Sequence, residues 1–358
     1  MPHQRTITLI LFCGFVLLLT IAISCNNEPG ESSHYSDNCK TDFKGFPDIP
    51  GWNFTSVPVP TEIKRARKIY FISELHGLLF SDENDIWLTE DGSITWQHVY
   101  NGEARAFDDV TFLDSLNGFA TAWYGHEGGL VKTTDGGMNW HLIKFSTRGV
   151  LFKISFVDTM IGFAFFRPKM VDGSYSKPFL AKTINGGTNW QEIPGVDVNG
   201  YSPTQLKVFS NGFGYMAGDG GKLYLTSDIG DHWIPVETGL EDIFWNQAIN
   251  ADTMYASSYD SFLKSTNGGV TWHEISKYFV ETGHFFSGSD GITVQRVASD
   301  LLYDVFEDCN AFLTTSDGGE TWIEGPPSYY FSVSQINFIN HKTGFLLFKN
   351  EIFRIHRD

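Results

Sequence analysis

The chain is poor in basic residues. Its 358 residues include 25 lysines and arginines against 42 aspartates and glutamates, which gives a formal charge of −17 at pH 7. A protein that binds nucleic acid needs surplus positive charge to displace the counterions of the phosphates, so the composition argues against such a partner. Only 19% of the residues are charged while 42% are hydrophobic. The chain therefore has enough apolar side chains for a folded core and is not typical of a disordered protein.

Cysteine is also scarce, and no two of the four cysteines have the C-x-x-C spacing of a zinc site. Two of them, Cys13 and Cys25, belong to the N-terminal segment. The other two, Cys39 and Cys309, are able to pair in an oxidising compartment or to remain free thiols. The sequence contains no Ser/His/Asp, HExxH or phosphate-loop motif. We therefore expect no metal site, no cofactor and no recognisable catalytic motif.

Only one long hydrophobic run is present, at the N-terminus. It extends from Ile7 to Ile23 behind Arg5 and is followed by Ser24 and Cys25. A cationic start, an apolar segment and small residues are typical of a secretory signal peptide. The position of the cysteine resembles a bacterial lipoprotein signal, in which Cys25 carries the lipid. A plain secretory signal and a retained membrane anchor remain alternatives.

The resemblance divides the N-terminal part of the chain into two segments. Residues 1–24 are expected to be the signal peptide, and residues 25–50 a flexible tether, because the latter are rich in Glu, Ser, Asn, Gly and Pro without apolar periodicity. The protein is then exported and anchored by lipid to a membrane of a bacterial cell envelope, on its periplasmic or outer side.

One eight-residue motif, S/T-x-D/N-x-x-x-x-W, occurs six times. Asp or Asn at the third position is able to accept backbone N–H groups, Gly supplies the positive φ of a tight turn, and Trp begins a strand with a large apolar ring. The motif resembles the Asp-box, or BNR, repeat of sialidases and sortilin-type receptors. We therefore expect a structural role for its acidic or amide residues and its tryptophans: Asp91, Trp96, Asp135, Trp140, Asn185, Trp190, Asp228, Trp233, Asn267, Trp272, Asp317 and Trp322.

The motifs recur with the period of a β-propeller blade. Their tryptophans are 39 to 50 residues apart, and each motif follows three short segments rich in β-branched and aromatic residues, so each unit has four strands. Seven units are present, with first strands expected to begin near Lys68, Asp109, Lys153, Gln205, Phe244, Ile292 and Gln335.

The last unit lacks a fourth strand, and a Trp-led segment, Gly51–Val57, precedes the first complete unit. If that segment pairs with the last unit, no edge strand is left open. The sequence thus predicts an all-β fold, a single seven-bladed β-propeller of four-stranded blades over residues 51–358, whose ring is closed by an N-terminal strand.

Candidate ligand-binding residues are expected on the face opposite the motifs, where loop lengths vary. The third unit carries the longest insertion, Arg167–Pro178. Aromatic side chains with polar neighbours are able to bind a sugar or a peptide, although the same residues also occur in ordinary loops. The candidates are Trp123, Tyr124, His126, Glu127, Arg167, Lys169, Tyr175 and His284.

The succession F-x-D/N-x-x-x-G-F, short strand, T-x-D-G-G-x-x-W resembles the photosystem II stability and assembly factor family over nearly the whole chain beyond the tether. That resemblance implies a non-catalytic scaffold. We interpret the chain as an interaction module, expected to be monomeric, that binds a protein or a glycan near a membrane. The alternative is a glycan-active enzyme, a glycoside hydrolase or sialidase-like protein, using carboxylates of the opposite face such as Glu103, Asp108, Asp109, Glu127, Asp219 and Asp260.

Overall fold

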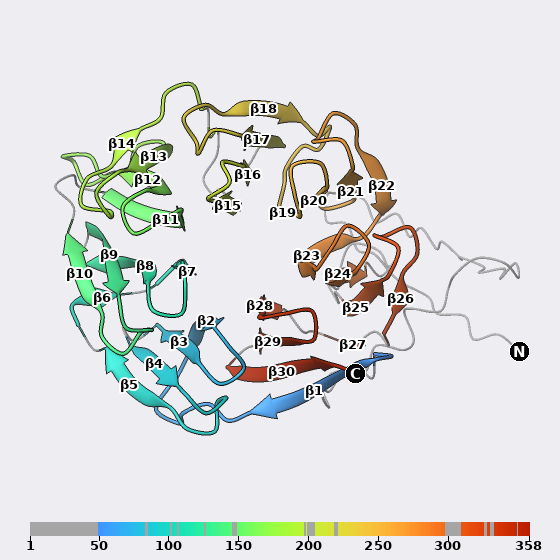
Figure 1. Ribbon diagram of the computed structural model, residues 1–358, viewed down its shortest axis with the longest axis horizontal. Coiled ribbons are helices and arrows are strands. Elements are labelled where there is room, and N and C mark those ends of the chain that lie inside the picture. Colours follow the sequence, from blue (N-terminus) through green and yellow to red (C-terminus); the bar gives the residue numbers. More distant parts are fainter. Residues whose placement is uncertain are drawn as a thin grey trace, which may run out of the picture.

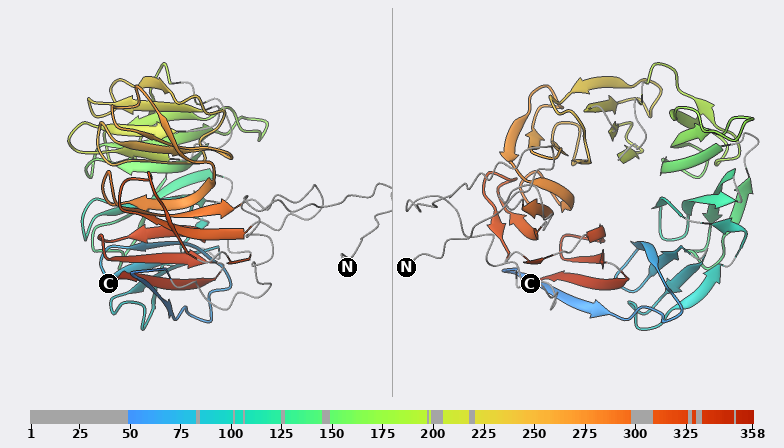
Figure 2. Two further views of the ribbon diagram at one scale, coloured as in Figure 1. Left: turned by 90° about the vertical axis from the view of Figure 1, so that its right-hand side faces the viewer. Right: turned by 180° about the vertical axis from the view of Figure 1, so that it is seen from behind.

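The computed structural model describes residues 49–358 except 83–84, 101, 106, 125–126, 145–148, 197, 199–204, 218–220, 298–308, 326–327, 330–332 and 349. The expected signal peptide, Cys25 and all of the tether but its last two residues lie outside these ranges, as do Cys39 and the side chain of Cys309. The described residues form thirty strands, β1–β30, in seven sheets arranged as a ring, whose centre we call the channel (Figure 1). Figure 2 shows the same ring from the edge and from behind.

Each sheet is one blade, with its first strand at the channel and its fourth at the rim. Blade 1 contains β2 (Ala66–Phe71), β3 (Gly77–Ser81), β4 (Ile86–Thr89) and β5 (Gln97–Tyr100). Blade 2 contains β6 (Ala104–Arg105), β7 (Val110–Phe112), β8 (Gly118–Tyr124), β9 (Glu127–Thr133) and β10 (His141–Lys144). Blade 3 contains β11 (Gly149–Phe156), β12 (Gly162–Pro168), β13 (Phe179–Thr183) and β14 (Gln191–Glu192).

The remaining blades follow the same order. Blade 4 contains β15 (Gln205–Val208), β16 (Gly214–Ala217), β17 (Lys222–Thr226) and β18 (Ile234–Glu237). Blade 5 contains β19 (Trp245–Ala248), β20 (Met254–Ser257), β21 (Phe262–Ser265) and β22 (His273–Ser276). Blade 6 contains β23 (Phe279–Phe285), β24 (Gly291–Val297), β25 (Cys309–Thr315), β26 (Ile323–Glu324) and β27 (Ser328–Tyr329). Blade 7 contains β28 (Val333–Phe338), β29 (Thr343–Phe348), β30 (Glu351–Arg357) and β1 (Trp52–Val57).

The N-terminal strand closes the ring, as the sequence predicts. β1 pairs antiparallel with β30 over six residue pairs, from Trp52 opposite Arg357 to Val57 opposite Ile352. Trp52 is buried and lies 6.1 Å from the ring of Phe286 and 5.8 Å from that of Phe338. The first and last strands of the chain thus complete one blade, and the predicted seven-bladed propeller is confirmed.

The prediction for blade 6 was wrong in one respect. Ile292, expected to begin the first strand, lies in the second strand β24, and the first strand is β23. Between its terminal phenylalanines β23 carries Glu281, Thr282, Gly283 and His284, which read as a loop in the sequence. Residues 291–295 of β24, the strand that contains Ile292, are buried, because a second strand lies between neighbouring strands and blades. The other six predicted starts lie in the first strands or one residue before them.

The motifs form the turns between third and fourth strands, and each turn is organised by the first side chain of the motif. In blade 2 the Thr133 hydroxyl accepts the N–H of Gly137 at 2.9 Å and donates to Asp135 at 2.9 Å. The Asp135 carboxylate in turn accepts the N–H of Asn139 at 2.9 Å. Gly136 and Gly137 have φ values of 76° and 94°, which favour glycine. The hydroxyl bond recurs in the other five motifs, and we call the face that carries these turns the motif face.

The core lies between neighbouring blades. Second strands such as β3, β20 and β29 are buried along their whole length. Phenylalanines that end the first strands pack against the preceding blade, as Phe156 of blade 3 does on Phe119 of blade 2 with ring centroids 3.7 Å apart. Motif tryptophans cover the same layers, with Trp140 packed on Phe80 and Phe112. Apolar packing thus fixes the blades, and with them the positions of the side chains that reach the channel.

Candidate functional site

The first strands present two rings of residues to the channel. Successive side chains of a strand point to opposite sides. In each first strand, the residue one position before the last and the residue three positions before the last therefore point to the same side. The residues three before the end form the upper ring: Lys68, Asp109, Lys153, Gln205, Trp245, Thr282 and Gln335. The residues one before the end form the lower ring: Tyr70, Thr111, Ser155, Lys207, Gln247, His284 and Asn337.

All seven residues of the upper ring line a cavity of about 450 Å³. The lining also includes Arg67, Asp108 and Phe244, at the starts of the first strands or just before them. These strands end at the motif face, so the cavity occupies the opposite end of the channel. A cavity of this volume lies in the range of small-ligand sites.

Side chains of the rings also seal the inner edges of the blades. The N–H of Ile154 donates to Asp109 at 3.0 Å, and that of Val208 to Ser155 at 2.9 Å. The amides of Gln247, Gln335 and Asn337 accept backbone N–H groups of the following blade in the same way. A first strand has no neighbouring strand on its channel side, so these bonds satisfy donors that would otherwise be open.

Bulges turn further side chains into the cavity. In blades 1, 3, 6 and 7 the first strand has one more residue than the second strand near the upper ring. Arg67, Lys153, Glu281 and Ser334 lie in these irregular segments, and all four line the cavity. A β-bulge re-aims a side chain and is frequent next to binding sites.

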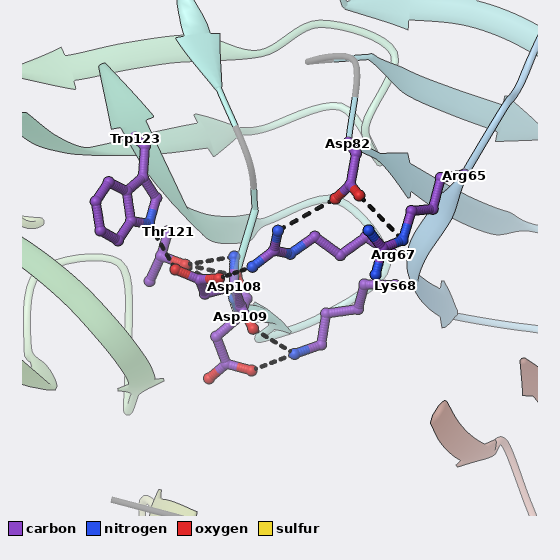
Figure 3. A network of polar contacts seen from close by, with 8 residues as sticks. All are labelled: Arg65, Arg67, Lys68, Asp82, Asp108, Asp109, Thr121 and Trp123. Atoms are coloured by element: carbon purple, nitrogen blue, oxygen red, sulfur yellow. Dashed lines mark hydrogen bonds and ion pairs between the residues drawn. The ribbon is translucent and has the colours of Figure 1, made fainter. Parts of the chain in front are cut away.

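A network of ion pairs fixes Asp108 at the edge of the cavity (Figure 3). Its carboxylate accepts Arg67 at 2.5 Å and the indole N–H of Trp123 at 2.6 Å. The carbonyl oxygen of Asp108 accepts Lys68 at 2.7 Å. Arg67 also binds Asp82 at 3.1 Å. Both carboxylate oxygens of Asp108 are therefore occupied by fixed donors.

Asp109 lies between two lysines. Its carboxylate accepts Lys68 Nζ at 2.9 Å on one side and the Ile154 N–H at 3.0 Å on the other. Burial raises the pKa of Asp109, but the charges of Lys68 and Lys153 and the Ile154 bond lower it more, so this pKa lies below its usual value. Asp109 is thus ionised at neutral pH.

Among the described residues, two other lysines of the rings, Lys153 and Lys207, make no hydrogen bond to a carboxylate, although the charge of Asp109 acts on both. Among the described residues, no hydrogen bond or ion pair holds Lys153 Nζ, and Lys207 Nζ contacts only the ring of Phe209, 5.8 Å from its centroid. Burial lowers the pKa of Lys153, and the charge of Asp109 offsets only part of this effect. Burial also lowers the pKa of Lys207, again against the charge of Asp109.

The residues expected from the sequence fall into three places. Lys169 and Tyr175 pair on the connection between β12 and β13. The guanidinium of Arg167, near the end of β12, lies 5.6 Å from the tyrosine ring. Trp123 joins the Asp108 network instead. Tyr124 and Glu127 pair at the ends of β8 and β9, while their side chains and all of His126 lie outside the described residues.

His284 lies apart from these groups. It belongs to the lower ring, toward the motif face, between Phe286 at 4.9 Å and Phe338 at 5.2 Å. Burial lowers its pKa to about 4, so it is neutral at pH 7. The structure therefore does not bring His284 together with Trp123 or Arg167.

Sequence reasoning missed the channel lysines. A pattern that could have found them is present in the sequence. The segments of the first three blades read Lys68-Ile-Tyr-Phe, Asp109-Val-Thr-Phe and Lys153-Ile-Ser-Phe. Each ends in Phe and carries polar or large residues one and three positions before it. In the sequence this pattern indicates the number of blades, whereas the side to which its polar residues point depends on strand register.

A second cavity, of about 440 Å³, lies on the motif face between blades 3 and 4. It is lined by the motif residues Asn185, Asn189 and Trp190 and by the ion pair of Lys182 with Asp231 at 2.5 Å. Within the described ranges, no group of three or more His, Cys, Asp or Glu residues is arranged to hold a metal ion. The same part of the chain contains no helix that is long and apolar enough to cross a membrane.

The chain is similar in structure to other propellers. No family model and no curated protein matches its sequence. A structure of YCF48 bound to a D1 peptide has a TM-score of 0.63 at 17% identity and covers 88% of this chain and 100% of that one. YCF48 from Cyanidioschyzon merolae has a TM-score of 0.64 at 17% identity, with 85% and 98% covered. The GH74 enzyme of Niastella koreensis has a TM-score of 0.60 at 13% identity, with 84% of this chain but 53% of the enzyme covered. These similarities show the fold.

Proposed function

We propose that the protein is a non-catalytic interaction propeller, exported and held at a bacterial envelope membrane by a lipid on Cys25, that binds a protein or a glycan through the face opposite the motifs. The observation that carries this proposal is the state of the carboxylates at the channel. Asp108 is held by Arg67 and Trp123, and Asp109 by Lys68 and the Ile154 N–H. Groups fixed in this way shape the surface, because their oxygens already accept hydrogen bonds from neighbouring residues.

A glycan-active enzyme remains the second candidate, supported by the likeness to the GH74 structure. Hydrolysis by two carboxyl groups requires one whose pKa is raised, so that it donates a proton. The pKa of Asp109 is instead lowered. Two other candidates are held by neighbours, Glu103 by Lys144 at 3.2 Å and Asp260 by Ser258 at 3.0 Å. Asp219 and the side chain of Glu127 lie outside the described residues.

Protein binding is supported by the group Arg167, Lys169 and Tyr175 and by the fact that one similar structure, that of YCF48, holds a peptide. Arginine and tyrosine are enriched at the centres of protein interfaces because they combine apolar area with hydrogen bonding. We therefore expect a partner to contact the β12–β13 connection.

Photo-crosslinking tests this expectation in cells that make the full-length protein. A photoreactive residue replaces Val171, which is fully exposed beside Tyr175, and in a matched control it replaces Val270, which is 80% exposed on the motif face. We expect one cross-linked species from position 171 only, lost in an Arg167→Ala/Tyr175→Ala background. The same species from both positions, or its persistence in that background, contradicts the proposed surface. Turnover in a broad glycoside screen, abolished by Asp108→Asn, would instead support the enzyme.

The anchor is tested separately. With Cys25→Ala we expect the precursor to remain unprocessed and to take up no radiolabelled fatty acid, whereas Cys13→Ala leaves both unchanged. Normal labelling of the Cys25 variant would show that the lipid, if any, is attached elsewhere.

A further inference from the structure

The turn between the first and second strands has one position that the backbone fixes in the same way around the ring. In blades 1–6 the carbonyl of this residue accepts the N–H of the fourth motif residue at 2.6 to 3.0 Å. Its own N–H donates to the side chain two residues earlier, as Leu116 does to Asp114 at 2.7 Å and Lys342 to Asn340 at 2.8 Å. We call this the turn position. Its occupants, in the order of the blades, are Leu75, Leu116, Met160, Gly212, Asp252, Ser289 and Lys342.

The turn position is apolar in three consecutive blades and polar or glycine in the other four. Leu75, Leu116 and Met160 are between 51% and 59% exposed, so their side chains are not part of the core. Asp252 and Lys342 occupy the same position and make the same bond to the side chain two residues earlier. The turn therefore folds without an apolar residue, and its geometry gives no reason for the large apolar side chains of blades 1–3.

The motifs of the same three blades add further apolar side chains to this face. Ile94, Met138 and Ile184 are between 45% and 73% exposed. Single apolar residues are ordinary on a protein surface, whereas a group of them marks an interaction site. We call the six residues of blades 1–3 the apolar patch: Leu75, Ile94, Leu116, Met138, Met160 and Ile184.

The turns that carry the apolar patch adjoin one another. Blades 1, 2 and 3 are neighbours in the ring (Figure 1). His76 Nε2 of blade 1 lies 2.6 Å from the carbonyl oxygen of Gly136, in the motif turn of blade 2. In blade 3, a Cβ added to Gly187 would lie 2.5 Å from the side chain of Leu130 in blade 2. Each motif turn thus lies against the preceding blade and links its apolar residues to those of its neighbour.

The charge around the apolar patch has one sign. In blades 1–3 the first turns and the motifs contain no lysine or arginine; these segments are residues 73–77, 89–96, 114–118, 133–140, 158–162 and 183–190. Their acidic residues are Glu74, Glu90, Asp91, Asp114, Asp135 and Asp158. Glu74 pairs with Arg354 of blade 7. Hydrogen bonds from Thr95 and from Asn117 lower the pKa values of Asp91 and Asp114, so both are ionised at neutral pH.

We propose that the apolar patch is a docking surface for a basic, amphipathic segment of a partner protein. The apolar residues of such a segment pack on the patch, while its lysines and arginines meet the surrounding carboxylates. The same charge argues against two other occupants, since an anionic membrane or a second copy of this face would bring like charges together. The patch lies on the motif face, so this proposal is independent of the function proposed for the opposite face.

Peptide binding to the full chain tests the patch. The probe is a fluorescent amphipathic helical peptide made of leucine and lysine, and binding is followed by anisotropy. In Leu75→Ser/Leu116→Ser/Met160→Ser, the turn position carries the residue that blade 6 has there, Ser289. We expect this patch variant to bind the peptide with an affinity lower by about tenfold or more.

The matched control removes three exposed apolar residues of blades 4–6, outside the patch. Ile234→Ser/Val270→Ser/Ile323→Ser should bind the peptide as the original protein does. An unchanged affinity in a folded patch variant, or an equal loss in the control, would overturn the proposal.

The role of charge is tested by Asp114→Asn/Asp158→Asn. Asn250 and Asn340 already occupy the equivalent place and accept the same backbone N–H, so the variant keeps its turns. We expect the affinity for the peptide to fall by about fivefold or more, and a peptide with glutamate in place of lysine not to bind. Equal binding of both peptides contradicts a basic partner. Binding to phosphatidylcholine vesicles that is lost in the patch variant also contradicts it, and identifies a membrane as the occupant.

Cross-linking in cells that make the full-length protein identifies the partner. With a photoreactive residue at Met138 we expect a cross-link to a segment rich in lysine and arginine, read by mass spectrometry. This cross-link is lost in the patch variant and persists in Arg167→Ala/Tyr175→Ala, so the two surfaces fail separately. No cross-link, or one to an acidic segment or to a second copy of the chain, contradicts the proposal.

Discussion

At the scale of single residues, one hydroxyl organises each motif turn. The Thr133 hydroxyl accepts the buried N–H of Gly137 and donates to Asp135, so both ends of the turn depend on it. We expect Thr133→Val to lower the free energy of unfolding by about 1–3 kcal/mol, because the shape is kept while a buried donor loses its acceptor. Urea unfolding measures the change. Asn139→Ala, which removes an exposed bond to the same carboxylate, serves as control and should cost less than about 0.5 kcal/mol.

The acidic residues of the motifs predict how stability depends on pH. Hydrogen bonds from the Thr321 hydroxyl and N–H and from Thr315 lower the pKa of Asp317 to about 2. In the unfolded chain it titrates near pH 4. The stabilisation is therefore complete above about pH 4 and is lost as the pH falls toward 2. We expect the free energy of unfolding, measured by urea titration, to change less between pH 4 and pH 2 in Asp317→Asn than in the original protein.

Two motifs provide the reverse experiment, because Asn185 and Asn267 already occupy the same position with the same backbone bonds. Asn185→Asp should add pH dependence in that window. If the free energy of unfolding depends on pH with the same slope in the original protein and in both variants, the motif carboxylates do not couple to folding.

Residue roles were predictable where they follow from local chemistry. The motif residues satisfy a turn within eight residues, so a single sequence shows their pattern. Trp123, by contrast, donates to Asp108, which lies fifteen residues away in the sequence. Asp109 accepts a hydrogen bond from Lys68, which belongs to another blade. Such contacts depend on strand register, and in blade 3 a bulge shifts the register at Lys153. No local pattern shows which lysine donates a hydrogen bond to Asp109.

At the scale of elements, β1 contributes the last strand of blade 7. It buries Trp52 and pairs with β30 along its length. We expect Trp52→Ala to lower the free energy of unfolding by about 3–5 kcal/mol through the cavity left between Phe286 and Phe338. Asn53→Ala, on the exposed side of the same strand, is the matched control. A melting temperature that does not change in the Trp52 variant would mean that the ring does not depend on this strand.

Elements were predictable as far as their composition is distinctive. Second strands such as β3, β20 and β29 are buried on both faces, and they can read as apolar runs, for example Gly344-Phe-Leu-Leu-Phe348. First strands face the channel, so they carry polar residues and bulges, and β23 with its Glu281, Gly283 and His284 was missed for that reason. β23, one of the seven first strands that line the cavity, is thus the one that the sequence did not identify.

At the scale of the whole molecule, the two ends of the described chain meet. The N–H of Asp358 donates to the carbonyl of Gly51 at 3.1 Å, and Trp52 lies opposite Arg357. Joining Asp358 directly to Gly51 creates a two-residue Asp-Gly hairpin, the sequence favoured in type I′ turns, and Gly51 already has a φ of 77°. We expect a circular permutant opened between Pro58 and Thr61 to fold with a melting temperature within a few degrees of the original.

Its control is a permutant opened inside β29, which is buried throughout. That chain should be insoluble or much less stable. Equal behaviour of both permutants, measured by thermal unfolding and by urea titration, would contradict the view that the ring is joined at the β1–β30 seam.

The seam also sets an order of events while the chain is made. Asn53 and its partner Asp358 are separated by 305 residues, so β1 pairs with β30 only after nearly the whole described chain has been synthesised. Six blades have all their strands before the ring is able to close. Until β30 is made, β1 has no partner strand and Trp52 lacks the Arg357 side chain that lies over its ring. Closure of blade 7 therefore joins the two strands of the described chain that are farthest apart in sequence, and it comes last among the seven blades.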